Sequence, residues 1–432
     1  MLLRFGIRNH TSFREPTELS FVANSQADAP TWRMTARDAP HGVLPALGVW
    51  GANASGKSNL LRAVLAFRKY VKDSFTGLER DAPLPWSPFA LRTGEADPPT
   101  HMDVDLILAG QRYHYGFRFT SRGVVEEWLY AWPRHRRQVL FHRDHTQADP
   151  WHFGANLGGQ RQVIARVTRP NSLFLSAAAQ HDHEQLVAVY RAITDAIVAE
   201  RRVELYGHPL FKADSPILDP ALRPLVTKFL AAADLGVLDI RAEEVPVVAE
   251  GPGEGAAGLS SEALRGVSEI VARAQPFYKV HLRHGLAGSE SWELVPEMES
   301  RGTQILLRRL EDMLRVLRGG GLLVLDEIDT SLHPDLCGAL IELFTTESAN
   351  PRGAQLLFAT HNEDLLKYLR RDEIVLVNKD VEGASTIRTA SQYPDLRGRD
   401  DVGRAYAQGR IRGVPALGNL VRITAQGLHH GA

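Results

Sequence analysis

The order of hydrophobic and polar positions predicts that the chain opens with strands and then enters a strand–loop–helix unit. Apolar and polar residues alternate over 3–7 and again over 17–22. Such alternation is typical of half-buried strands. The apolar run 44–50 then leads directly into a glycine-rich segment. The residues that follow this segment have helical spacing to about Lys72, which predicts a helix beginning at the end of the loop.

The middle of the chain changes from strand periodicity to helical periodicity. Short alternating segments predict an antiparallel meander with strands at 102–108, 112–119 and 127–132. Helical spacing dominates from about residue 170 and predicts helices over 186–197, 221–233 and 262–274. Strand patterns return at 278–283 and 291–294. No heptad pattern is sustained, so a compact helical insertion is expected rather than a long coiled coil.

The C-terminal part contains an amphipathic helix followed by two continuous apolar runs. The helix is predicted over 305–317, and the runs cover 322–325 and 355–360. A continuous apolar run bounded by polar residues predicts a strand buried on both faces, which is the usual state of a parallel strand. The sequence therefore predicts an α/β protein with an additional antiparallel β subdomain.

Composition and charge indicate an ordinary globular protein. Hydrophobic residues make up 44% of the 432 residues and charged residues 23%, with a net charge of −1. This balance gives no global attraction to nucleic acid or to an anionic membrane. The single cysteine, Cys337, excludes an intrachain disulfide and a cysteine-rich zinc module. With no signal-like N-terminus and no apolar run long enough to span a bilayer, we expect a cytoplasmic protein without membrane contact.

The glycine-rich segment Gly51-Ala52-Asn53-Ala54-Ser55-Gly56-Lys57-Ser58 fits the P-loop pattern G-x-x-x-x-G-K-[ST]. In such a loop, backbone N–H groups point at phosphate oxygens and the following helix adds its partial positive charge. Lys57 is expected to reach the β- and γ-phosphates and Ser58 to bind Mg²⁺. The predicted nucleotide-binding residues are Gly51, Asn53, Ala54, Ser55, Gly56, Lys57, Ser58 and Asn59.

The run Leu322–Leu325 ends in two acidic residues, Asp326 and Glu327. Ligands of α/β sheets bind at the C-terminal ends of the strands, so both carboxylates are expected beside the P-loop. Asp326 is predicted to hold Mg²⁺ together with Ser58. Glu327 is predicted to act as general base on the attacking water. The pair corresponds to a Walker B pattern, and the expected cofactors are ATP and Mg²⁺.

Two further segments are candidates for the same site. His361 follows an apolar strand end and is predicted to donate to the γ-phosphate, although a helix-capping role is the alternative. Ser300 and Gly302 lie at the start of the amphipathic helix, where a small polar residue and a glycine form an anion site. The alternative for Ser300 is an ordinary helix N-cap.

A group of histidines between the meander and the helical region is a candidate metal site. It comprises His135, His142, His145 and His152. Histidine is a common metal ligand, but no helical H-x-x-x-H pair is present and several arginines crowd the region. We expect these residues to be strand and turn histidines.

The order of these motifs resembles the ATP-binding-cassette (ABC) type ATPase heads of structural-maintenance-of-chromosomes (SMC) proteins. Ser300–Gln304 resembles the ABC signature, 328–334 the D-loop region, and His361 the switch histidine. The resemblance implies a head split by an insertion, with residues 1–165 as its first half, 166–276 as a helical insertion and 277–432 as its second half. It also implies a homodimer or higher homo-oligomer, in which Ser300 and Gly302 cover ATP bound by another subunit.

More narrowly, the chain is similar to standalone bacterial AAA ATPases of the overcoming-lysogenization-defect and abortive-infection group, including the ATPase subunits of PARIS-type and restriction-locus-associated systems. The similarity is carried by Asn53–Ser55, Glu299–Thr303, Ser331–Pro334 and the tail Gly409–Pro415. It implies a sensor or scaffold ATPase in anti-phage defence that controls a separately encoded effector, frequently a nuclease. The alternative is a DNA-repair or chromosome-associated ATPase that acts on DNA directly.

The sequence also departs from the family pattern. We find no convincing Q-loop glutamine, because Gln111 falls in a predicted hairpin turn. His333 stands where many such heads have a D-loop aspartate. A GTP-specific switch is disfavoured because Asn378-Lys379-Asp380 is one residue short of the N-K-x-D base-reading motif.

Overall fold

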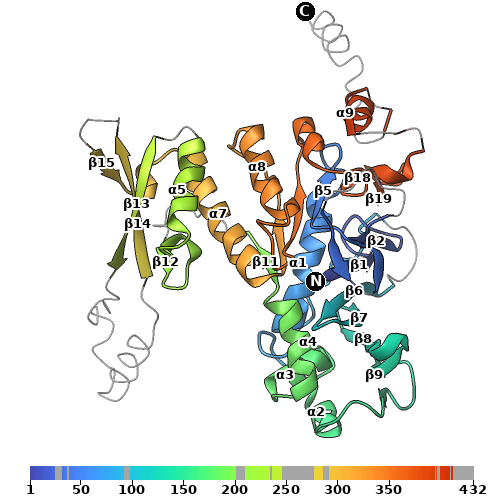
Figure 1. The fold of residues 1–432 in the computed structure, drawn as a ribbon. Helices are drawn as coiled ribbons and strands as arrows, with labels where there is room; N and C mark the ends of the chain where they lie inside the picture. Colours follow the sequence, from blue (N-terminus) through green and yellow to red (C-terminus); the bar gives the residue numbers. More distant parts are fainter. Residues whose placement is uncertain are drawn as a thin grey trace, which may run out of the picture. The chain divides into compact units, whose positions relative to one another are not determined.

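The chain forms two compact units in the computed structural model (Figure 1). The first unit comprises Met1–Ala199, Val316–Asp329 and His333–Ala432, and the second comprises Glu200–Arg315 and Thr330–Leu332. The structure describes residues 1–24, 32–36, 38–91, 98–200, 210–233, 236–245, 277–285, 291–394, 396, 399–408 and 410–411. The predicted helix 262–274 and most of the tail 409–415 therefore lie outside the described residues.

A six-stranded, mainly parallel sheet carries the predicted nucleotide-binding motifs. Its strand order is β11-β16-β17-β5-β18-β19. The strands are β5 (Ala46–Trp50), β11 (Ile197–Ala199), β16 (Leu322–Leu325), β17 (Gln355–Ala359), β18 (Ile374–Lys379) and β19 (Ser385–Thr389). All neighbours pair in parallel except β18 and β19, which form an antiparallel hairpin. Every residue of β5, β16 and β17 is buried, as the continuous apolar runs predicted.

A seven-stranded antiparallel sheet forms the second layer of the first unit. Its order is β10-β9-β8-β7-β6-β1-β2. Its strands are β1 (Leu2–Arg8), β2 (Thr17–Ser20), β6 (Thr100–Leu108), β7 (Gln111–Thr120), β8 (Gly123–Ala131), β9 (Gln138–Asp144) and β10 (Trp151–Phe153). The predicted meander is confirmed as β6–β8, extended by β9 and β10. A short hairpin of β3 (Met34–Ala36) and β4 (Ala39–Val43) lies outside both sheets.

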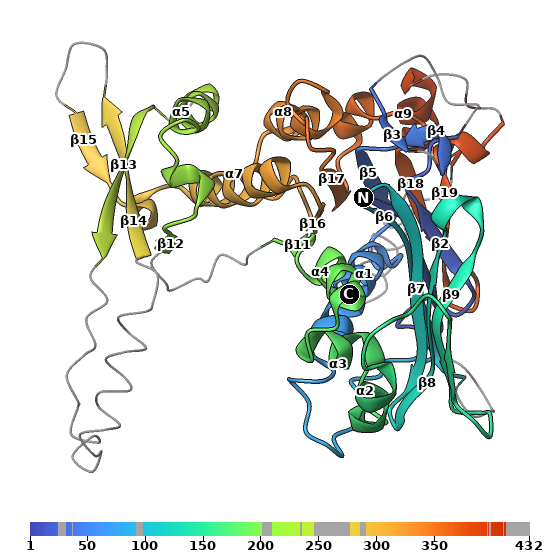
Figure 2. The same ribbon diagram turned by 60° about the horizontal axis from the view of Figure 1, so that its bottom comes forward.

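Helix α1 (Lys57–Asp73) lies between the two sheets (Figures 1 and 2). Its Phe67 ring stacks on Phe117 of β7, with ring centroids 5.4 Å apart, and meets Phe5 of β1 edge-on at 5.9 Å. Leu60, Leu61 and Val64 lie in the same continuous core. Each large side chain buried in this way contributes about 1.5–3 kcal/mol to folding. The helix that begins at the P-loop is therefore also the centre of the first unit's core.

The helices after the antiparallel sheet belong to this same core. They are α2 (Arg161–Val167), α3 (Phe174–Gln180) and α4 (Glu184–Thr194). Leu186, Val189 and Ile193 of α4 are buried in the core that contains α1. The predicted boundary between the first half of the head and the insertion, at residue 165, thus differs from the observed one at Ala199. Helical periodicity shows that a face is buried but does not identify the element that covers it.

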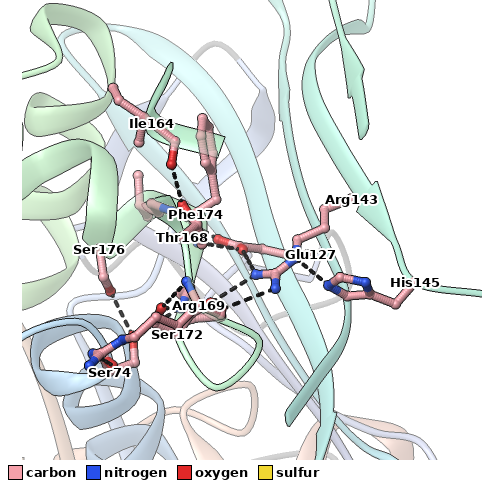
Figure 3. A network of polar contacts seen from close by, with 12 residues as sticks. Ser74, Glu127, Arg143, His145, Ile164, Thr168, Arg169, Ser172, Phe174 and Ser176 are labelled. Atoms are coloured by element: carbon pink, nitrogen blue, oxygen red, sulfur yellow. Dashed lines mark hydrogen bonds and ion pairs between the residues drawn. The ribbon is translucent and has the colours of Figure 1, made fainter. Parts of the chain in front are cut away.

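A buried polar network joins α1, α3 and the antiparallel sheet (Figure 3). The Glu127 carboxylate, fully buried on β8, accepts hydrogen bonds from the backbone N–H groups of Phe174 (2.6 Å) and Leu175 (3.0 Å) at the start of α3. It also accepts the Tyr115 hydroxyl at 2.9 Å and lies 3.7 Å from the buried guanidinium of Arg143. Burial raises the pKa of Glu127 and lowers that of Arg143, and each partner's charge opposes the other's shift.

The second unit contains a four-stranded antiparallel sheet, whereas a helical insertion was predicted. Its elements are β12 (Leu210–Lys212), α5 (Arg223–Ala232), β13 (Val237–Val245), β14 (Phe277–Gly285) and β15 (Ser291–Leu294). The predicted strands 278–283 and 291–294 exist, but they pair within this sheet and not with the P-loop sheet. A strand pattern in the sequence does not specify which other strand it pairs with. The sequence therefore could not show that these two strands belong to the sheet of the second unit.

The remaining helices are α7 (Arg301–Gly319), α8 (Pro334–Thr345) and α9 (Arg399–Ala407). Most of α7 belongs to the second unit, and its residues from Val316 onward belong to the first. Cys337 is buried on α8, as its apolar surroundings predicted. No helix among the described residues is both long enough and apolar enough to cross a membrane.

Candidate functional site

A pocket of about 510 Å³ opens where four parallel strands of the first unit end. Its walls come from the loops after β5, β16 and β17 and from the last residue of β18. The lining residues are Asn53, Ala54, Ser55, Gly56, Lys57, Ser58, Asn59, Asp326, Glu327, Ala359, Thr360, His361 and Lys379. Carboxyl ends of parallel strands meet at one edge of a sheet, which is where α/β proteins bind ligands. The fold thus brings together predicted residues from three distant parts of the sequence.

Gly56 is required by the conformation of the loop. Its φ is +113°, and a Cβ at this position would lie 2.8 Å from Ser12 Oγ and closer still to Ser385 Oγ. The Ser385 hydroxyl lies 2.6 Å from the Ser55 carbonyl oxygen and 2.8 Å from Ser12 Oγ, and the Asn59 amide donates to Ser12 Oγ at 2.9 Å. The start of β19 and the turn after β1 therefore hold the loop in place.

Lys57 is buried at the base of the loop. Its ammonium donates to the carbonyl oxygens of Gly51 (2.8 Å) and Ala52 (3.1 Å). Burial lowers the pKa of Lys57, while the nearby carboxylates Asp326 and Glu327 act in the opposite direction. A phosphate anion in the loop would replace the two carbonyl contacts with stronger charge-assisted hydrogen bonds.

Ser58 and Asp326 form the contact between the P-loop and the acidic strand end. The Ser58 hydroxyl donates to Asp326 Oδ1 at 3.2 Å. A hydroxyl and a carboxylate are hard oxygen ligands of the kind Mg²⁺ takes, and the ion typically keeps several waters and binds few protein groups. The donor set present therefore fits Mg²⁺ bound by these two side chains.

The residues after β16 are held in an unusual conformation. Glu327 has φ +56°, in the left-handed region, where a non-glycine residue is destabilised by about 1–2 kcal/mol. The neighbouring backbone is anchored, because the N–H of Ile328 donates to the Ala359 carbonyl at 3.0 Å and the Thr360 hydroxyl donates to Asp329 Oδ1 at 2.7 Å. Outliers of this kind concentrate at functional sites, and here the outlier is a carboxylate in the pocket wall.

His361 lines the same pocket at the end of β17. Burial lowers its pKa, and the positive charge of Lys57 lowers it further. The imidazole is therefore neutral near pH 7 and offers one N–H donor. The capping role in this segment falls to Asn362, whose side chain accepts the Asp364 N–H at 2.9 Å.

Three residues of the site were missed from the sequence. Lys379 follows the apolar strand Ile374–Val377, so the rule that placed Asp326 would also have found it. Thr360 ends an apolar run in the sequence, but its bond to Asp329 depends on two strands being neighbours. Tyr406 of α9 lies beside the backbone of Gly51, and burial raises the pKa of its hydroxyl to about 12. That contact joins segments 355 residues apart, and no local pattern signals it.

Ser300 and Gly302 belong to the second unit. The Ser300 hydroxyl accepts the Thr303 N–H at 3.1 Å and lies 2.8 Å from the Thr303 hydroxyl, which is the geometry of a helix N-cap. A Cβ on Gly302 would lie 2.8 Å from the Ser331 carbonyl oxygen. The backbone of the D-loop-like segment thus packs directly on the signature-like glycine.

His333, which stands where many such heads have a D-loop aspartate, caps a helix. Its Nδ1 accepts the Asp335 N–H at the start of α8.

The histidines that follow the meander make protein contacts. His142 lies 2.9 Å from Glu126 Oε1, and His145 accepts the Arg143 Nε–H at 2.9 Å. Within the described ranges, no group of three or more His, Cys, Asp or Glu side chains is arranged to hold a metal ion.

Comparisons with known proteins identify a family and several structures of similar fold. The family model described as "AAA domain, putative AbiEii toxin, Type IV TA system" matches residues 47–367. No curated protein matches the chain in sequence.

The solved structures similar to this chain include three SMC head domains. The head domain from Thermotoga maritima is 13% identical with a TM-score of 0.38, over 90% of this chain and 98% of that one. The head with an extended coiled coil from Pyrococcus furiosus, bound to the C-terminal domain of ScpA, is 11% identical with a TM-score of 0.44, over 95% and 99% of the chains. The head with a coiled coil and joint from Pyrococcus yayanosii is 10% identical with a TM-score of 0.42, over 94% and 99%.

The family match and the pocket coincide. The matched range contains the P-loop, the acidic strand end and His361. Since it covers well over half of the sequence, this chain belongs to the AAA domain family described as putative AbiEii toxin of a Type IV TA system.

Proposed function

We propose that this chain is a Mg²⁺-dependent, ABC-type ATPase that acts as a sensor or scaffold in bacterial anti-phage defence. The observation that carries the proposal is the convergence of Lys57, Ser58, Asp326, Glu327 and His361 on one pocket at the strand ends. A cation, two hard oxygen ligands, a carboxylate and a neutral imidazole are the groups that phosphoryl transfer to water requires. The pocket volume of about 510 Å³ also suits a nucleotide.

Each side chain has a distinct role in this proposal. The P-loop backbone and Lys57 hold the phosphates of ATP, and His361 donates to the γ-phosphate. Ser58 and Asp326 hold Mg²⁺, which neutralises phosphate charge when bound. Glu327 orients a water whose oxygen attacks the γ-phosphorus. The bond from that phosphorus to the β–γ bridging oxygen breaks, ADP leaves, and the water proton passes to the Glu327 carboxylate.

The second part of the proposal concerns assembly. Ser300 and Gly302 cover the γ-phosphate of ATP bound by another copy of the chain, so that ATP joins two subunits and hydrolysis releases them. This inference rests on the resemblance of 300–304 to an ABC signature. The close packing of Gly302 on the Ser331 carbonyl supports it, because it places a residue of the D-loop-like segment directly against the signature-like glycine.

The proposed role in anti-phage defence rests on the family match and on the resemblance, and not on the geometry of the pocket. The family description names a toxin of a Type IV TA system, which agrees with a resemblance to abortive-infection ATPases. In this proposal the ATP-dependent assembly holds a separately encoded effector until a phage trigger arrives. A DNA-repair ATPase acting on DNA directly remains the alternative, and a net charge of −1 does not favour it.

Replacement of Glu327 by glutamine tests the chemical core of the proposal. The variant should bind ATP normally while phosphate release falls about 10²–10⁴-fold, because the proton acceptor is lost. It should also accumulate as an ATP-bound oligomer in light scattering. The matched control is Glu347→Gln, an exposed glutamate away from the pocket. Normal turnover by Glu327→Gln would remove Glu327 from the role of base.

The defence role has its own experiment. Cells carrying the gene with its natural neighbours should reduce phage plating, and the Glu327→Gln substitution should abolish this reduction. Equal plating on cells with and without the locus, across a broad phage panel, would contradict the defence role and leave the ATPase assignment intact.

A further inference from the structure

A second cavity lies beside the nucleotide pocket in the first unit. It encloses about 390 Å³ and is lined by Asn378, Lys379, Asp380, Thr386, Arg388, Tyr393 and Arg410. Asn378, Thr386 and Arg388 lie on one face of the β18–β19 hairpin, because Thr386 pairs with Asn378 and side chains two residues apart along a strand share a face. Tyr393 follows the short 3-10 helix η6 (Ala390–Gln392), and Arg410 follows α9.

The cavity is rich in positive charge. Lys379, Arg388 and Arg410 all line it. Within the part of the chain that the structure describes, neither Lys379 nor Arg388 forms an ion pair. Arg410 is positioned by its backbone N–H, which donates to the Ala405 carbonyl at 2.9 Å, and by its Nε–H, which donates to Gln408 at 2.9 Å. Its two terminal guanidinium nitrogens are not used in those bonds.

The carboxylate of Asp380 in the cavity wall is directed elsewhere. Oδ1 of Asp380 accepts the backbone N–H groups of Glu382 (2.9 Å) and Ala384 (2.8 Å), and its Oδ2 lies 3.7 Å from the Arg14 guanidinium. Asp380 therefore stabilises the β18–β19 turn and does not neutralise the three cations. A cavity with this balance attracts an anion.

We propose that this cavity is a second binding site, separate from the P-loop, for a small phosphorylated ligand of the mononucleotide class. Arg388, Arg410 and Lys379 would bind the phosphate, since guanidinium groups pair with phosphate through two parallel hydrogen bonds. The half-buried ring of Tyr393 would stack on the base, and Asn378 and Thr386 would hydrogen-bond to the base or ribose.

The dimensions favour a free nucleotide over a nucleic-acid strand. The cavity lies at the lower end of the range for small-ligand pockets. Among the described residues that line it, Tyr393 is the one aromatic side chain, whereas strand binding usually uses several aromatic side chains along a basic groove. The net charge of the chain is −1, which provides no extended field for a polyanion.

Two contacts would connect this second site to the P-loop. Lys379 lines both cavities. Tyr406 of α9, four residues before Arg410, lies beside the backbone of Gly51. Occupation of the second site would thus fix both Lys379 and the C-terminal helix that contacts the loop. The assignment goes beyond the proposed ATPase activity and does not require it.

The test uses the full-length chain with the P-loop disabled. Lys57→Ala protein should still bind one equivalent of AMP by isothermal titration calorimetry. Adding Arg388→Ala should weaken that binding at least tenfold, because it removes a charge-assisted phosphate contact. Adding Arg352→Ala, an exposed arginine away from the cavity, should leave the binding unchanged. Loss of all AMP binding in Lys57→Ala alone would overturn the second site, as would unchanged affinity after Arg388→Ala.

A second arm identifies the ligand class. Tyr393→Leu, in the Lys57→Ala background, should weaken AMP roughly tenfold through lost stacking while leaving pyrophosphate affinity unchanged. Pyrophosphate binding as tightly as AMP, or an equal effect of Tyr393→Leu on both, would overturn the mononucleotide assignment. Unfolding temperatures of all variants should agree. If AMP binds Lys57→Ala while Glu327→Gln hydrolyses ATP normally, the second site stands although the ATPase mechanism fails.

Discussion

The hydroxyl of Ser58 lies 3.2 Å from Oδ1 of Asp326, although 268 residues separate the two in sequence. Ser58 is the second residue of α1, which follows β5 and the P-loop. Asp326 directly follows β16, which lies two positions from β5 in the same sheet. Neither side chain alone would bind a hard cation well. Their proximity places a hydroxyl and a carboxylate on one Mg²⁺ position, and it gives the first prediction.

We expect Ser58→Ala to weaken the magnesium dependence of ATP binding. Loss of one oxygen ligand should raise the Mg²⁺ concentration for half-maximal binding roughly tenfold or more. The measurement is ATP affinity across a Mg²⁺ titration, with EDTA as the zero point. Ser348→Ala, an exposed serine outside the pocket, is the control. An unchanged magnesium midpoint would mean that the Ser58–Asp326 contact is only structural.

Ser300→Arg should leave ATP binding by the individual chain intact and reduce turnover, because the added bulk would block a neighbouring subunit's nucleotide. Ser300 also caps α7, and loss of the cap destabilises a helix by about 0.5–2 kcal/mol. Ser300→Ala controls for this, since it removes the cap without adding bulk.

A mixing experiment separates contact within a chain from contact between chains. Ser300→Arg protein has an intact P-loop, and Lys57→Ala protein has an intact Ser300. If the site is shared between subunits, mixing the two inactive proteins should restore part of the phosphate release. Activity in the mixture no greater than the sum of the separate proteins would contradict a shared site.

Glu127→Ala should destabilise the first unit strongly. The carboxylate is fully buried, accepts two backbone N–H groups of α3, and lies beside the buried Arg143. Removing one partner of a buried ion pair leaves an uncompensated charge, which typically lowers the free energy of unfolding by about 3–5 kcal/mol. Urea unfolding measures the change, and the exposed Glu79→Ala should fall within about 0.5 kcal/mol of the parent. A small effect at Glu127 would mean that water reaches Arg143.

Stability should fall in mild acid because of His10. Burial lowers its pKa from 6.5 to about 4. The unfolded chain therefore binds a proton more readily than the folded one. The contribution of His10 to stability is complete above about pH 6.5 and is lost as the pH falls toward 4, by at most about 3 kcal/mol. In His10→Phe, the unfolding temperature should depend less steeply on pH in this window. Parallel curves for the two proteins would show that other groups cause the acid sensitivity.

Much of the nucleotide pocket could be predicted from the sequence because its parts are local patterns. The P-loop needs a strand, a turn with Gly56 and a helix within about 25 residues, and the Asp326 and His361 segments each need only an apolar strand with a polar end. Residues 53–58 of the P-loop, Asp326 and His361 all line the observed pocket. The antiparallel meander was predictable for the same reason, since alternation and turn residues are local signals.

The assignment of segments to units was decided by the tertiary structure. Residues 186–194 have helical spacing, but only the fold shows that α4 packs in the core around α1. Strands 278–283 and 291–294 were correctly placed, yet their pairing with β12 and β13 depends on contacts that no strand pattern encodes.

What the sequence by itself determined is the set of local geometries: a phosphate-binding turn, buried strands with acidic or polar ends, and amphipathic helices. Each follows from residue periodicity and backbone preference over short distances. Only the tertiary structure decided that Tyr406 lies beside Gly51, and that Arg388 and Arg410 share a cavity. These relationships depend on strand order and on packing between distant segments, and no local pattern of residues specifies either.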